Sequence, residues 1–236
     1  MSRREPKGPP DVIELSDVSY SYGDRPLLSG LSLSLAAGSF HFLTGPSGSG
    51  KTTFLRLCTM ELAPAEGRVE VMGTDTRDLD RDPLAKLRQR IGVVKQDCQF
   101  LDHLSVSENV AMPLMVAGRD PEHDRDNVAE LLSWVGLTDH ANALPPQLSG
   151  GERQRAALAR AVILSPDLVL ADEPTGNVDW EMANRLLSLL VELNRMGKTI
   201  VVATHDLSLI RAAKSQVQAR VLRLAGGSVH LAGADL

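Results

Sequence analysis

The segment at residues 45–53, GPSGSGKTT, constrains the fold more than any other part of the chain. It fits the pattern GxxxxGK[ST]. An apolar run at residues 39–44 precedes it and an amphipathic run at residues 54–60 follows it, so a strand, a loop and a helix are expected in that order. Phosphate oxygens need many short N–H donors that converge from one side, and a glycine-rich loop at a helix N-terminus supplies them. The residues expected to surround the phosphates are Gly45, Pro46, Ser47, Gly48, Ser49, Gly50, Lys51, Thr52 and Thr53.

Two side chains of this loop have separate predicted roles. Lys51 adds a mobile positive charge, and Thr52 is expected to bind Mg²⁺ through its hydroxyl group. A glycine-rich loop that binds nothing is the alternative, and the specific spacing in this context disfavours it.

Size and composition limit the classes of protein that the chain can belong to. A length of 236 residues suits one α/β domain, or a domain with a sub-domain, and 43% hydrophobic residues suffice for a sizeable core. The net charge of −5, without a basic stripe, argues against a nucleic-acid partner. Cys58 and Cys98 are isolated, which favours incidental thiols in a reducing compartment, the cytoplasm. The sequence contains no run of about 18 apolar residues, so no membrane span is expected. Residues 1–10 are expected to be a flexible tail.

The N-terminal part of the chain shows the pattern of half-buried strands. Apolar and polar residues alternate at 12–20 and 31–35, and residues 67–72 look like a further strand. We expect a turn at residues 21–26 between the first two strands. Tyr22 in this turn is positioned either to stack on a purine base or simply to pack against its neighbours.

Three short apolar runs, at residues 91–94, 168–171 and 199–204, predict buried strands of a parallel sheet. Gln96, Asp172, Glu173 and His205 follow these runs, where strand ends face a ligand crevice. Asp172 is suited to hold Mg²⁺ through water, and Glu173 to accept a proton from an attacking water. His205 is suited to bond a γ-phosphate, although a lone histidine is more often structural and two carboxylates can simply mark a strand end.

Between residues 97 and 147 the strand signals stop, and residues 106–116 and 124–135 predict helices inserted into the sheet domain. The sequence LPPQ, residues 144–147, predicts a stiff hinge. LSGGE follows, in which Ser149 is a good N-cap and Gly150 and Gly151 leave the first-turn amides bare. Either a second anion site or an ordinary helix cap explains this segment. After it, residues 153–164 and 182–195 predict helices, and 219–224 with 228–231 predict a closing hairpin.

The chain resembles the nucleotide-binding subunits of ABC-type ATPases from Val12 to about Leu231. The resemblance rests on five features in this order: GPSGSGKT, Gln96, LSGGE, LVLADE and His205. The resemblance implies an α/β fold of the P-loop NTPase type: a mostly parallel core sheet, an N-terminal antiparallel β sub-domain and a helical sub-domain inserted at about 97–147. Residues 11–236 then form a single domain. The resemblance also implies a homodimer in which ATP and Mg²⁺ lie between the phosphate loop of one copy and LSGGE of the other.

The same resemblance implies a role for each matched residue. Tyr22 matches the aromatic residue that stacks on the base, and Gln96 matches the Q-loop glutamine near the metal. Ser149 and Gly151 match the partner's donors to the γ-phosphate, Gly150 between them belongs to the same nucleotide-binding segment, and Asp179 falls in the D-loop. The implied metal ligands are Thr52, Gln96 and Asp172, and the implied catalytic residues are Glu173, His205 and Gln96.

Within the family, the chain resembles the FtsE group of cell-division ATPases in GSFHFLTGPSG, FLDHLS, ENVAMPLMVAG, ALPPQLSGGERQRAALARAV, ADEPTGNVD and ELNRMGKTIVVATHD. That resemblance implies an integral membrane partner, FtsX, which docks on the helical insert. It also implies a place at the cytoplasmic face of the bacterial inner membrane at the division site, and signalling to cell-wall hydrolases. One position departs from the pattern: Lys95 stands where relatives usually have an aromatic residue.

Three other functions fit parts of the sequence. ATPases of the lipoprotein-releasing or macrolide-exporter type share ENVAMPL and LSGGERQR. Soluble ABC ATPases that act on DNA or ribosomes usually carry two cassettes, a coiled coil or basic insertions, which the sequence lacks. A nucleotide-regulated interaction protein with little turnover is disfavoured by Glu173 and His205.

Overall fold

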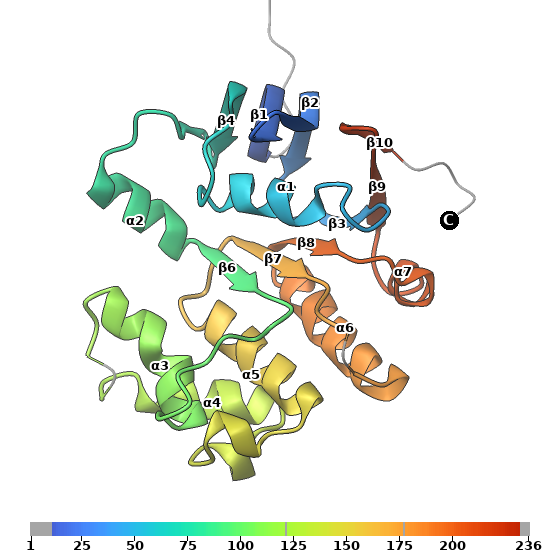
Figure 1. The fold of residues 1–236 in the computed structure, drawn as a ribbon. Coiled ribbons are helices and arrows are strands. Elements are labelled where there is room, and N and C mark those ends of the chain that lie inside the picture. Colours follow the sequence, from blue (N-terminus) through green and yellow to red (C-terminus); the bar gives the residue numbers. More distant parts are fainter. Residues whose placement is uncertain (1–10, 121, 177, 232–236) are drawn as a thin grey trace, which may run out of the picture.

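Two β-sheets and a group of helices make up the computed structural model, which describes residues 11–120, 122–176 and 178–231 (Figure 1). The tail predicted at residues 1–10 lies outside the described residues, as do residues 232–236 of the predicted domain. In this part of the chain, no helix is both long and apolar enough to cross a membrane.

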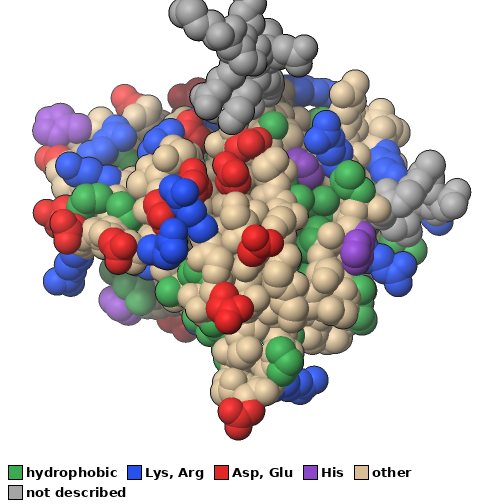
Figure 2. Space-filling view, turned by 90° about the horizontal axis from the view of Figure 1, so that it is seen from above, with side chains coloured by type: hydrophobic (Ala, Val, Ile, Leu, Met, Phe, Trp, Pro, Cys, Tyr) green, Lys and Arg blue, Asp and Glu red, His purple; other side chains and the backbone are tan. Residues whose placement is uncertain are grey.

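The first sheet is antiparallel and has the order β2-β1-β4-β5. Its strands are β1 (Asp11–Tyr22), β2 (Arg25–Ala36), β4 (Glu66–Val71) and β5 (Thr74–Asp75). The sequence predicted neither β5 nor the full length of β1 and β2. On the face that carries this sheet, acidic and basic side chains are interspersed (Figure 2).

The turn predicted at residues 21–26 is present but shorter than predicted. Tyr22 pairs with Arg25, so only Gly23 and Asp24 form the turn. Gly23 has a φ of 58°, which a glycine adopts without strain and which matches the twist of the two strands in a tight hairpin. The hairpin therefore carries Tyr22 and Arg25 as neighbours at its end.

The second sheet has the order β10-β9-β3-β8-β7-β6, and all its strands are parallel except the edge strand β10 (Ser228–Leu231). The parallel strands are β9 (Ala219–Ala225), β3 (Phe40–Thr44), β8 (Thr199–Ala203), β7 (Leu168–Asp172) and β6 (Ile91–Val94). β3 and β8 are buried along their whole length, because helices or the other sheet cover both faces. The prediction of a mostly parallel core sheet is confirmed.

Helices cover the two faces of the parallel sheet. α1 (Lys51–Cys58) packs between the two sheets, and its Phe54 and Leu57 share one core with strands of both. α5 (Gly150–Val162), α6 (Trp180–Arg195) and α7 (Leu207–Lys214) pack in a second core on the opposite face (Figure 1). α2 (Arg81–Gln89) precedes β6 in the chain, and α7 was not predicted.

A third core joins α3 (Val106–Val116), α4 (Arg125–Trp134) and the inner face of α5. Ser105 caps α3, in a reciprocal capping box with Glu108. The segment predicted as a stiff hinge forms a 3-10 turn at Pro145–Gln147, and a second such turn lies at Thr138–His140. Ala156 and Ala159 of α5 belong to this core, so the packing of the helical group continues past residue 147. The limits of the helical sub-domain, at about residues 97 and 147, stay a prediction.

Candidate active site

The glycine-rich loop connects β3 to α1, as predicted, and its backbone needs glycine at particular positions. Gly45 has a φ of 154°, and a Cβ there would lie 2.3 Å from the Leu224 carbonyl oxygen. Gly50 caps α1 in the left-handed conformation, with a φ of 105°. Backbone amides of the loop and the N-terminus of α1 therefore converge without side chains between them, which suits a phosphate group.

Lys51 lies folded over this loop. Its Nζ donates to the Gly45 carbonyl oxygen at 2.9 Å and lies 3.9 Å from Oε1 of Glu173. Only 11% of its side chain is exposed. Nζ also donates to the Pro46 carbonyl oxygen at 3.5 Å, a long bond that a phosphate oxygen can replace, so two of the three N–H donors can turn to a ligand.

Thr52 and Asp172 meet across the sheet edge, although 120 residues separate them. The Thr52 hydroxyl donates to Oδ2 of Asp172 at 2.7 Å. Burial, the largest cause, raises the pKa of Asp172; the Thr52 hydrogen bond and the Lys51 charge oppose this shift, and the Glu173 charge adds to it. A hydroxyl and a carboxylate fit Mg²⁺, which proteins often hold by one carboxylate together with substrate phosphates.

Glu173 and His205 form the other polar pair of the site. Nδ1 of His205 lies 2.9 Å from Oε1 of Glu173, within hydrogen-bond distance. Glu173 has a φ of 45°, unusual for a residue with a side chain, and its N–H donates to the Ala203 carbonyl oxygen of β8 at 2.8 Å. Such strained conformations cost roughly 1–3 kcal/mol and are concentrated at functional sites. The pair is suited to orient a water molecule and accept its proton.

Gln96 follows β6 and also faces this region. Its carbonyl oxygen accepts a hydrogen bond from Nε2 of Gln154 in α5, at 3.1 Å. Lys95, the departure from the family pattern, lies 3.4 Å from Oε1 of Glu61. Its side chain therefore pairs with an acidic residue that follows α1.

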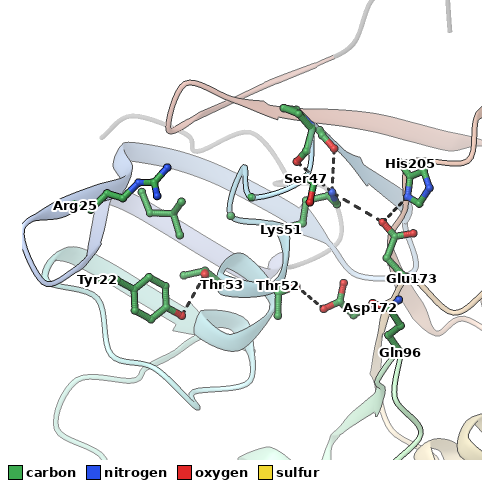
Figure 3. A pocket seen from close by; sticks show the side chains of 15 residues that line it. Tyr22, Arg25, Ser47, Lys51, Thr52, Thr53, Gln96, Asp172, Glu173 and His205 are labelled. Carbon is green, nitrogen blue, oxygen red and sulfur yellow. Dashed lines mark hydrogen bonds and ion pairs between the residues drawn. The ribbon is translucent and has the colours of Figure 1, made fainter. Parts of the chain in front are cut away.

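These groups line one open cavity of about 760 Å³ (Figure 3). Tyr22 lies at the end away from Glu173, half exposed, with its hydroxyl 3.4 Å from Oγ1 of Thr53 and accepting from Arg56 at 3.3 Å. The cavity is lined by Tyr22, Arg25, Leu27, Gly45, Pro46, Ser47, Gly48, Gly50, Lys51, Thr52, Thr53, Gln96, Asp172, Glu173 and His205. Sequence reasoning missed Arg25 and Leu27, because it placed the start of β2 six residues too late.

The other predicted residues lie elsewhere. Ser49 belongs to the loop but does not line the cavity, and its buried Oγ has no hydrogen-bond partner in the described part of the chain. Ser149 caps α5 in a reciprocal capping box with Glu152, and Gly150 begins that helix. Asp179 caps α6 by accepting from the Met182 N–H at 2.8 Å.

Gly151 packs against α6: a Cβ at this glycine would lie 2.7 Å from Cγ of Met182. The N-termini of α5 and α6 therefore touch. The four residues Ser149, Gly150, Gly151 and Asp179 are all described, and none of them lines the cavity.

The sequence profile of the ABC transporter family matches residues 28–176, which include the phosphate loop, LSGGE, Asp172 and Glu173. The chain belongs to the ABC transporter family. Members of this family bind ATP, generally with Mg²⁺, and the chain is an ATP hydrolase of the ABC type.

Two relatives within the family carry the same name. The cell division ATP-binding protein FtsE of Haemophilus influenzae is 44% identical over 203 residues, which are 85% of this chain and 93% of that protein. FtsE of Bacillus subtilis is 38% identical over 207 residues, 87% of this chain and 91% of that protein. The resemblance to the FtsE group is confirmed.

A solved structure shows the same fold. A dimeric ATP-binding cassette in a post-hydrolysis state, bound to ADP and Pi, superimposes with a TM-score of 0.83 and is 36% identical in sequence. The match covers 92% of this chain and 96% of that one. The P-loop fold of the ABC type, predicted from the motifs, is therefore confirmed.

Proposed function

We propose that this chain is the ATP-hydrolysing subunit of a membrane complex of the FtsE type. Two copies close around ATP at the cytoplasmic face of the bacterial inner membrane, and an integral membrane partner of the FtsX type couples closure to cell division and to the activation of cell-wall hydrolases. The similarity to two FtsE proteins over most of both chains supports this proposal.

The observation that carries the proposal is the separation of LSGGE from the cavity. The α5 N-terminus, with Ser149 and Gly150 exposed, offers first-turn amides and a positive dipole end to solvent. The cavity is open, and its lining includes Lys51 and the phosphate loop but no residue of LSGGE. A second copy would bring these donors to the cavity, and the similar solved cassette is dimeric.

Each side chain then has a role that follows from its position. The loop amides and Lys51 bind the phosphates, while Thr52, Gln96 and Asp172 are the residues that would hold Mg²⁺, which neutralises phosphate charge when bound. Glu173 accepts a proton from the attacking water, and His205, within hydrogen-bond distance, keeps its carboxylate oriented.

The partner copy's donors complete the site. Its Ser149, Gly150 and Gly151 bind the γ-phosphate, while Asp179 fixes the α6 N-terminus beside them. ATP therefore favours the closed dimer, because only ATP carries the group that both copies share. Hydrolysis removes this shared contact, so the dimer opens.

The test uses Glu173→Gln, which removes the proton acceptor and keeps the shape of the side chain. We expect this variant to bind Mg-ATP and to elute as a dimer in size-exclusion chromatography with light scattering. Adding Ser149→Arg should abolish the dimer and leave ATP binding by the monomer intact. Ser188→Arg, on an exposed part of α6, is the matched control and should still dimerise. A Glu173→Gln variant that stays monomeric in Mg-ATP, or that hydrolyses ATP at the normal rate, would contradict the proposal.

The identity of the membrane partner needs its own experiment. Purification of the tagged chain from solubilised membranes should recover an FtsX-like protein, whereas a lipoprotein-release or exporter protein would favour that alternative. Leu101 and Met115, 44% and 61% exposed, lie in the segment predicted to dock this partner. Changing both to glutamate should prevent co-purification and leave ATP affinity unchanged, and a retained complex would count against docking there.

A further inference from the structure

The end of the cavity away from Glu173 and His205 has its own chemistry. Tyr22, Arg25 and Leu27 line it, which gives one aromatic, one cationic and one aliphatic side chain. Both acidic residues that line the cavity, Asp172 and Glu173, lie on the other side of the phosphate loop (Figure 3). A positive charge at the Tyr22 end therefore has no carboxylate of the cavity wall beside it.

Arg25 is held next to Tyr22 by the hairpin. The two residues are cross-strand partners on either side of the two-residue turn, and partners of this kind have Cβ atoms roughly 4.5–5.5 Å apart on the same face of the sheet. Figure 3 shows both side chains reaching from the hairpin toward the phosphate loop. One planar ligand group can therefore touch both.

The guanidinium of Arg25 has no partner within the protein. In residues 11–120, 122–176 and 178–231 it makes no hydrogen bond and no ion pair. Arg56, the other arginine near Tyr22, differs: it donates to the Tyr22 hydroxyl and lies 3.4 Å from Glu61. Of these two arginines, Arg25 is thus the one available to a ligand at this end of the cavity.

The geometry points to Arg25 as a nucleoside-binding residue that holds the purine base of ATP together with Tyr22. The aromatic ring stacks on the base, and the planar guanidinium packs on the same π-system as a cation, a contact that arginine makes better than lysine. Arg25 projects from the β1–β2 hairpin and not from the phosphate loop, so we expect it to add affinity for the nucleoside and to leave the phosphate chemistry unchanged. This inference rests on the proposed function only in placing ATP in the cavity.

The experiment compares steady-state ATPase kinetics of the wild-type chain with Arg25→Ala and Arg25→Lys. A cation–π contact of the usual strength corresponds to a roughly 3- to 30-fold rise in KM for Arg25→Ala, with kcat unchanged. Arg25→Lys should recover only a small part, because the ammonium lacks the planar surface. Arg125→Ala, at an exposed arginine at the start of α4, is the control and should match the wild type.

Inhibition by tripolyphosphate separates contact with the nucleoside from general attraction of charge. Its inhibition constant should be the same in the wild type and in Arg25→Ala, because tripolyphosphate has no base. A KM within twofold of the wild type in Arg25→Ala, full recovery by lysine, or an equal loss of tripolyphosphate binding would each overturn the inference. A wild-type chain that neither binds nor hydrolyses ATP would instead refute the proposed function, so the two failures are distinguishable.

Discussion

Replacing Lys51 with alanine is the most direct test of the phosphate site. In the structure the Lys51 ammonium donates to the Gly45 carbonyl oxygen at 2.9 Å and only at 3.5 Å to that of Pro46, so two of its three donors can turn to phosphate oxygens when ATP binds. Hydrogen bonds to charged groups contribute roughly 1.5–3 kcal/mol each, so their loss together costs about 3–6 kcal/mol of binding free energy. Every 1.4 kcal/mol is about tenfold, and we therefore expect ATP affinity to fall by at least about a hundredfold.

Isothermal titration calorimetry with a non-hydrolysable ATP analogue and Mg²⁺ measures this loss without turnover. Lys198→Ala is a matched control, since Lys198 also donates to a backbone carbonyl, that of Ser165 at 2.9 Å, but lies outside the cavity. Thermal unfolding of both variants checks that the fold is retained. A dissociation constant for Lys51→Ala within threefold of the wild-type value, in a folded protein, would refute the assignment of this lysine to the phosphates.

Two further predictions concern stability. Burial, with a smaller effect of the Arg220 charge, lowers the pKa of His41 in β3 to about 4 from its ordinary value of 6.5. Because the unfolded chain takes up this proton first, the free energy of unfolding should be unaffected by His41 above about pH 6.5 and should fall by up to about 3 kcal/mol as the pH drops from 6.5 to 4. Urea unfolding from pH 7.5 to 4 measures this fall, and a His41→Gln variant with the same pH dependence would contradict it. In Gly92→Ala, the new Cβ would lie 2.4 Å from the Ala161 carbonyl oxygen of α5. We therefore expect the free energy of unfolding, measured in urea, to fall by about 1–3 kcal/mol or more. A variant as stable as the wild type would contradict this prediction and show that α5 shifts freely.

Sequence reasoning located those parts of the site that a contiguous segment builds. The loop at residues 45–53 supplies its own glycines, lysine and hydroxyl group, and a following helix supplies the dipole, so the pattern specifies both shape and chemistry. LSGGE likewise specifies its own helix start, and Ser149 forms the capping box that its spacing to Glu152 allows. The parallel strands were predictable because buried strands are short, apolar and uninterrupted by charge.

Only the tertiary structure decided which distant side chains meet. Asp172 reaches Thr52, and Glu173 reaches His205, because β7 lies beside β8 and β8 beside β3 in the sheet, an order that local sequence does not encode. Lys95 likewise pairs with Glu61 only because the fold brings the segment after β6 close to the segment after α1. Arg25 was missed because one tight glycine turn, and not the alternation of the strands, determines which residues end the hairpin. The sequence thus determined the chemistry of each segment, and the packing of the sheet determined the site that those segments share.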